Sequence, residues 1–117
     1  YTTPLDLARL ASHALRNKIF ADIVATKNIE FADVTGQKKY ELKNLNKLLG
    51  ARGVNGVKTG YTNEAGQVLV TSKIEIDENN KKHTLIIVVM DSLDRFSDTS
   101  KLLNSVAGNI NYSSIHP

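Results

Sequence analysis

Three consecutive residues near the middle of the chain, Lys58, Thr59 and Gly60, combine groups that could hold the carboxylate end of a peptide. The lysine supplies a compact positive charge and the threonine an O–H donor, and a carboxylate accepts hydrogen bonds from both. The glycine has no side chain, so another backbone can approach it closely. An extended ligand could pair with this segment as an added β-strand. Taken alone, the tripeptide is too short to be specific, and Lys58 could equally be a solvated lysine on an outer strand.

The other residues that could bind a metal or exchange protons form no recognisable site. The chain has no cysteine, which excludes disulfides, thiolate catalysis and cysteine-based zinc sites. Three histidines share no metal-ligand spacing and are interpreted as unrelated surface residues: His13, His83 and His116. Three aspartates are assigned to a strand end and to the first turn of a helix, where the helix dipole favours acids: Asp91, Asp94 and Asp98.

The composition describes one ordinary globular domain. The chain has 117 residues, of which 41% are hydrophobic and 23% charged. Its net charge of +3 is too small, and its basic residues too scattered, to indicate a nucleic-acid partner. The longest apolar run, residues 85–90, is far shorter than the roughly 20 residues of a membrane helix.

Helix signals stand at both ends of the sequence. Thr3, Pro4 and Asp6 form a helix start with a capping box, and apolar residues recur at helical spacing through 4–16. A short helical turn is expected at 19–25 and another at 44–49. The apolar positions of 95–108 fall on one face and predict a closing helix.

The middle of the chain has the pattern of β-structure. Residues 27–42 surround the turn signal Thr35-Gly36 and predict a small hairpin. Residues 56–61 are expected to form a strand antiparallel to residues 68–76, which alternate with a strand period and are expected to pair in turn with residues 85–90. Residues 85–90 are apolar at every position, which predicts a central strand covered by helices on each side. The expected fold class is therefore α+β, with three antiparallel strands flanked by helices.

A longer stretch around the tripeptide resembles a known family. Residues 44–50, then 53–62 with Lys58-Thr59-Gly60-Tyr61-Thr62, then Ala65-Gly66, are similar to the third-motif region of the serine D-Ala-D-Ala carboxypeptidases. These are the low-molecular-mass penicillin-binding proteins. The flanking residues 1–8 and 85–103 are also similar, so the resemblance covers essentially the whole chain. It implies the C-terminal half of a penicillin-binding, β-lactamase-like domain.

The other two motifs of this family are S-x-x-K, which carries the nucleophilic serine, and S-x-N. No lysine of the chain has a serine three positions before it, and no serine has an asparagine two positions after it. The chain also lacks an initial methionine and opens on a helix start. We therefore expect residues 1–117 to be a partial catalytic domain whose nucleophile lies upstream of Tyr1, with no catalytic residue of its own.

The resemblance implies substrate-binding roles for Lys58, Thr59, Gly60 and Tyr61, with the backbone N–H of Tyr61 in an oxyanion hole. It implies peptidoglycan stem peptides ending in D-Ala-D-Ala and β-lactams as ligands, and neither a metal nor an organic cofactor. The missing N-terminal half, or another copy of the chain, is the expected protein partner. The implied location is outside the cytoplasmic membrane of a bacterium. A β-lactamase or transpeptidase fragment, or a non-catalytic interaction module of the same fold, remains an alternative.

Overall fold

The computed structural model describes residues 1–113, and His116 lies outside the described residues. It contains three helices and five strands. In chain order they are α1 (Pro4–Ala14), α2 (Lys18–Ala25), β1 (Asn28–Ala32), β2 (Lys39–Lys43), β3 (Val54–Thr62), β4 (Gly66–Ile76), β5 (Lys82–Ser92) and α3 (Arg95–Val106).

Local polar groups begin both N-terminal helices. The Thr3 side chain accepts a hydrogen bond from the Asp6 backbone N–H at 3.2 Å, so the expected N-cap of α1 is confirmed. The Asn17 side chain accepts from the Phe20 N–H at 3.1 Å and begins α2 in the same way. The first helix ends at Ala14, two residues earlier than expected. At 44–49 the expected helical turn is present only as a single turn, in which the Leu49 N–H donates to the Asn46 carbonyl at 3.1 Å, and no helix forms.

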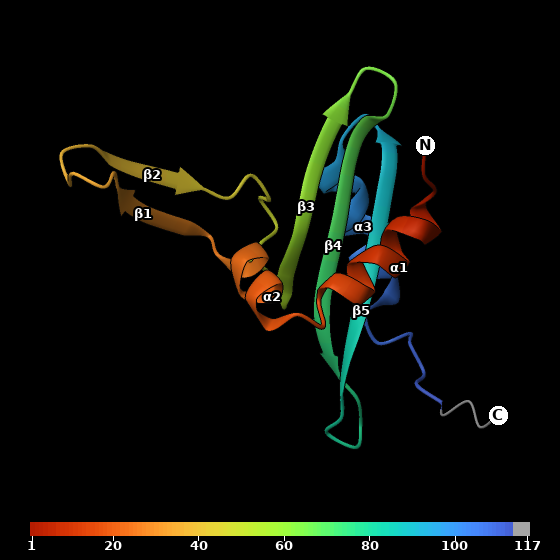
Figure 1. The fold of residues 1–117 in the computed structure, drawn as a ribbon. Helices are drawn as coiled ribbons and strands as arrows, with labels where there is room; N and C mark the ends of the chain where they lie inside the picture. Colours follow the sequence, from red (N-terminus) through yellow and green to blue (C-terminus); the bar gives the residue numbers. More distant parts are fainter. Residues whose placement is uncertain (114–117) are drawn as a thin grey trace.

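The main sheet has three antiparallel strands in the order β3-β4-β5 (Figure 1). Helix α1 packs on one face and α3 on the other. One buried cluster contains Ile87, Val89 and Leu103 beneath α3, and the other contains Ala11 and Val70 beneath α1. The α+β class with three antiparallel strands between helices is confirmed.

The structure corrects the predicted place of β5 in the sheet. The strand order β3-β4-β5 confirms the predicted pairing of residues 68–76 with both 56–61 and 85–90, and helices cover both faces of β5 as expected. Only the expectation that β5 is central was wrong, because within residues 1–113 it is an outer strand and β4 lies in the centre. The uniform apolar pattern of residues 85–90 arises because helices cover both faces of β5. Side-chain pattern reports which faces of a strand are buried and says nothing about its edges. The outer edge of β5 therefore carries no strand partner in the described chain.

A separate two-stranded hairpin, β1–β2, projects from the body of the molecule beside α2 (Figure 1). Its register pairs Ile29 with Leu42 and Phe31 with Tyr40, so these four side chains share one face. The rings of Phe31 and Tyr40 stack with their centroids 5.2 Å apart. All four side chains are exposed.

Candidate substrate-binding strand

The structure places the predicted site residues on β3, the strand at one edge of the sheet. Lys58 pairs with Val70, Thr59 with Leu69, Gly60 with Val68 and Tyr61 with Gln67 on β4. Because β3 is an outer strand, its other edge carries no strand among residues 1–113. The backbone groups along that edge are the ones that could pair with an extended ligand.

The four residues differ sharply in exposure. Lys58 and Tyr61 are exposed, whereas Thr59 has only 7% of its surface accessible. Leu69, the partner of Thr59 across the ladder, is fully buried. The Lys58 ammonium donates a hydrogen bond to the Thr59 carbonyl. The lysine charge is therefore held along the strand, while the threonine hydroxyl lies in a confined position.

An apolar hollow of about 410 Å³ lies against this strand. Its walls are formed mainly by helix α1 and strands β3 and β4, and Lys58, Thr59 and Gly60 contribute to its lining. Hydrophobic side chains that line it include Leu7, Leu10 and Phe20. A hollow lined by apolar groups beside a cation and a hydroxyl can take a ligand or a further protein segment.

Arg95, at the start of α3, also reaches this strand, and sequence reasoning missed this contact. Its guanidinium donates a hydrogen bond to the Gly60 carbonyl at 2.8 Å. It also lies over the ring of Phe96, with 5.1 Å from the guanidinium carbon to the ring centroid. Arg95 and Gly60 are far apart in sequence, and no spacing rule connects them.

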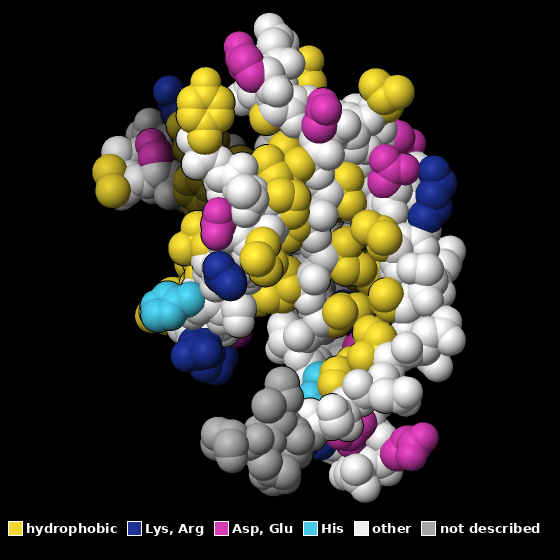
Figure 2. All heavy atoms as spheres, turned by 90° about the vertical axis from the view of Figure 1, so that its right-hand side faces the viewer, with side chains coloured by type: hydrophobic (Ala, Val, Ile, Leu, Met, Phe, Trp, Pro, Cys, Tyr) yellow, Lys and Arg dark blue, Asp and Glu magenta, His cyan; other side chains and the backbone are white. Residues whose placement is uncertain are grey.

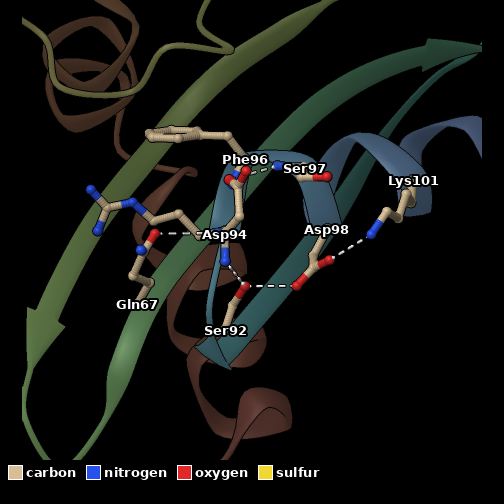
Figure 3. Close-up of polar contacts among 8 residues, drawn as sticks. Gln67, Ser92, Asp94, Phe96, Ser97, Asp98 and Lys101 are labelled. Carbon is tan, nitrogen blue, oxygen red and sulfur yellow. Dashed lines mark hydrogen bonds and ion pairs between the residues drawn. The ribbon is translucent and has the colours of Figure 1, made fainter.

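A second polar cluster lies at the start of α3, near Arg95 (Figure 3). The Asp94 carboxylate accepts hydrogen bonds from the Phe96 and Ser97 N–H groups, both at 3.1 Å, and caps the helix. The Ser92 hydroxyl donates to the Asp98 carboxylate at 2.7 Å, and Lys101 adds an ion pair at 3.1 Å. These contacts, the Ser92 hydrogen bond first, hold the pKa of Asp98 below its usual value. The assignment of Asp94 and Asp98 to a helix start is confirmed.

The histidines lie apart from the strand motif. His13 is exposed on α1, as expected. His83 was expected to be a surface residue, but it is partly buried: its Nε2 lies 2.8 Å from the Asp77 carboxylate and its ring stacks on Tyr112. The hydrogen bond from His83 is the main cause of a lowered Asp77 pKa. Within residues 1–113, no group of three His, Cys, Asp or Glu residues is arranged to hold a metal ion.

A sequence profile described as D-alanyl-D-alanine carboxypeptidase, peptidase S11, matches residues 1–94. The chain belongs to this family. No curated protein sequence is significantly similar to the chain. None of the described helices is long and apolar enough to cross a membrane.

Solved structures agree with this S11 assignment. The Streptomyces K15 DD-transpeptidase is 34% identical, with a TM-score of 0.78, over 92% of this chain and 42% of that one. Penicillin-binding protein D2 from Listeria monocytogenes, in a cefotaxime-bound form, is 27% identical, with a TM-score of 0.60, over 81% of this chain and 36% of that one. The chain therefore spans about two-fifths of the length of these solved structures.

Proposed function

We propose that this chain is the C-terminal part of the catalytic domain of a serine-type D-alanyl-D-alanine carboxypeptidase, and that it supplies the substrate-binding strand. The observation that carries the proposal is the position of Lys58, Thr59 and Gly60 on an outer strand beside an apolar hollow, in a chain of the S11 family. The open edge of β3 suits an extended stem peptide ending in D-Ala-D-Ala, or a β-lactam, bound by strand addition.

Each residue of the strand has a distinct role in this proposal. The Lys58 ammonium binds the terminal carboxylate of the substrate, and the Thr59 hydroxyl donates a hydrogen bond to the same group. Gly60 leaves room for the substrate backbone. The backbone N–H of Tyr61 donates to the oxyanion that forms at the scissile carbonyl.

The reaction would be acyl transfer through a serine that is not part of residues 1–117. Its oxygen bonds to the carbonyl carbon of the penultimate D-alanine, the peptide C–N bond breaks, and the terminal D-alanine leaves with a proton. Water then cleaves the ester and regenerates the serine. The chain alone is expected to be inactive, because no serine precedes a lysine at S-x-x-K spacing. The complete enzyme would act on peptidoglycan outside the cytoplasmic membrane of a bacterium.

Labelling with a fluorescent penicillin tests this proposal. The complete domain, with the portion that precedes Tyr1 in related proteins, should form a covalent adduct visible as a fluorescent band. The isolated 117-residue chain should form none, because acylation needs an activated nucleophile. A labelled band from the isolated chain would contradict the assignment of the nucleophile to the missing portion.

Two substitutions in the complete domain test the strand itself. Lys58→Ala should slow acylation by about a hundredfold, because a charge-assisted hydrogen bond to the carboxylate is lost. Thr59→Val should slow it by about tenfold, because only one neutral donor is removed. Lys39→Ala, an exposed lysine on the hairpin strand β2, is the matched control and should leave the rate unchanged. Normal acylation of the Lys58→Ala variant would show that the tripeptide is not a binding motif.

Transpeptidation is a second candidate, because the Streptomyces K15 enzyme that this chain resembles is a DD-transpeptidase. Both reactions pass through the same acyl-enzyme and differ in whether water or an amine accepts the acyl group. A D-Ala-D-Ala peptide offered with and without an amino-acid acceptor separates them. Predominant hydrolysis in the presence of the acceptor supports the carboxypeptidase, and predominant transfer supports the transpeptidase.

A further inference from the structure

The end of β5 contains a β-bulge that redirects the chain toward β3. The register pairs Leu69 with Val89 but Gln67 with Ser92, so β5 has one residue more than β4 in this interval. Asp91, within the bulge, has a left-handed φ of 52°. Its N–H donates to the Ala65 carbonyl at 3.0 Å, which anchors the bulge to the β3–β4 turn. Bulges bend a strand and re-aim the residues that follow it.

Gln67, on β4, holds the redirected segment through both ends of its side-chain amide. The Nε2 group donates to the Leu93 carbonyl at 2.9 Å, and Oε1 accepts from the Arg95 backbone N–H at 3.3 Å. Figure 3 shows the Gln67 side chain extended toward the start of α3. A single amide thus bridges the two residues on either side of Asp94. This dual role needs one donor and one acceptor in the same side chain.

Few contacts hold the Arg95 guanidinium against the strand motif. Its only described side-chain hydrogen bond is the one to the Gly60 carbonyl, and its buried Nε has no hydrogen-bond partner among residues 1–113. The Phe96 ring supports the guanidinium from one side. Because so few groups hold the guanidinium, its position depends on where the Arg95 backbone lies, and Gln67 binds that backbone directly.

The Gly60 carbonyl and the Tyr61 N–H belong to one peptide group. A trans peptide is planar, so its C=O and N–H point in opposite directions. A hydrogen bond from Arg95 to the carbonyl oxygen therefore also orients the Tyr61 N–H. It further polarises the peptide and strengthens that N–H as a donor.

We infer that Gln67 is a positioning residue for the substrate strand, which acts through Arg95 to orient the Gly60–Tyr61 peptide group. This inference rests on the proposed function, in which the Tyr61 N–H stabilises the oxyanion. Gln67 touches neither the substrate nor the reacting atoms. Its contribution is to keep Arg95 where its guanidinium meets the Gly60 carbonyl.

The test measures the second-order rate constant of acylation by fluorescent penicillin in the complete domain. Gln67→Met keeps the size of the side chain and removes both hydrogen bonds, and it should acylate about tenfold more slowly. Gln37→Met, which changes the chain's other glutamine on an exposed loop, is the matched control and should acylate at the rate of the unmodified domain. Gln67→Glu keeps the acceptor but loses the donor to Leu93, and it should also acylate more slowly. This variant provides the test if Gln67→Met does not fold.

A double-substitution cycle separates positioning from general destabilisation. If Gln67 acts through Arg95, Gln67→Met should cause little further loss in an Arg95→Ala background. An equal loss in both backgrounds would overturn the inference, as would acylation of Gln67→Met or Gln67→Glu within twofold of the unmodified rate. If the unmodified complete domain is not acylated at all, the proposed function fails, and the inference about Gln67 falls with it. Acylation of the unmodified domain with no effect of Gln67 would reject the inference alone.

Discussion

Asp98 illustrates how a single carboxylate secures the start of α3. It accepts hydrogen bonds from the Ser92 hydroxyl and the Lys101 ammonium, while Ser92 also accepts from the Asp94 N–H at 3.0 Å. These contacts favour the ionised form and lower the Asp98 pKa below the ordinary value of 3.8. The carboxylate thus connects the end of β5 to the helix that carries Arg95.

The lowered Asp98 pKa predicts a specific acid sensitivity. A carboxyl group whose pKa is lower in the folded state adds stability above its unfolded pKa, and this stability is lost as pH falls through the folded pKa. The melting temperature of the complete domain should therefore fall more steeply below about pH 4 than that of its Asp98→Asn variant. Glu64→Gln, at an exposed position without a described ion pair, serves as the control. Parallel melting curves for the unmodified domain and Asp98→Asn would contradict this prediction.

At the scale of elements, the β3–β4 turn and the β5 bulge depend on a glycine. Gly66 has a left-handed φ of 61°, and a methyl group added there would lie 2.9 Å from the Asp91 Cα. That neighbour is backbone and cannot rotate away. Gly36, in the hairpin turn, has a similar φ of 72° but nothing within 4 Å of an added methyl group. A substitution at Gly36 therefore reports backbone strain alone, and one at Gly66 reports backbone strain together with steric crowding.

Substitution by alanine should distinguish these two effects. Gly36→Ala should lower the free energy of unfolding of the complete domain by about 1 kcal/mol, because alanine is strained at positive φ. Gly66→Ala should cost roughly 1–3 kcal/mol more, since the methyl group displaces the backbone of the bulge. Denaturant titration of both variants measures the difference. Equal losses at the two positions would show that the contact with Asp91 is relieved without cost.

At the scale of the whole molecule, two apolar surfaces of the sheet lack a cover within the described residues. One is the hollow between α1 and β3–β4. The other follows the outer side of β5, where Val88, Met90 and Leu102 line a shallow hollow. Figure 2 shows hydrophobic side chains gathered on the side of the molecule that carries β5. Large apolar patches rarely stay bare on a soluble monomer.

We therefore expect the isolated chain to self-associate or to bind the N-terminal portion of the domain that the proposed function places before Tyr1. Light scattering of the isolated chain should show oligomers, and adding the separately produced N-terminal portion should convert them into a one-to-one complex. The complex should also regain labelling by fluorescent penicillin, because nucleophile and substrate strand are then brought together. If the isolated chain is monomeric at high concentration and forms no complex with the N-terminal portion, this expectation is contradicted.

Much of the candidate site could be predicted from local sequence. Thr3 and Asp94 cap helices through groups only two or three residues away, and alternation along residues 68–76 reports a strand with one face toward each helix layer. The strand placement of Lys58 to Tyr61 was predicted from the resemblance of the motif and its flanks to the family, and it is confirmed. These features depend only on neighbouring residues, so they could be predicted from the sequence alone.

Other features depended on the path of the chain through space. Only the tertiary structure placed β5 at an edge, because apolar pattern describes the faces of a strand and not its neighbours. The Arg95 guanidinium meets the Gly60 carbonyl across 35 residues of chain, next to the β5 bulge and the Gln67 amide. In the same way, the pairing of His83 with Asp77 required a turn to close between them. Such contacts follow from packing and register, which no short stretch of sequence encodes.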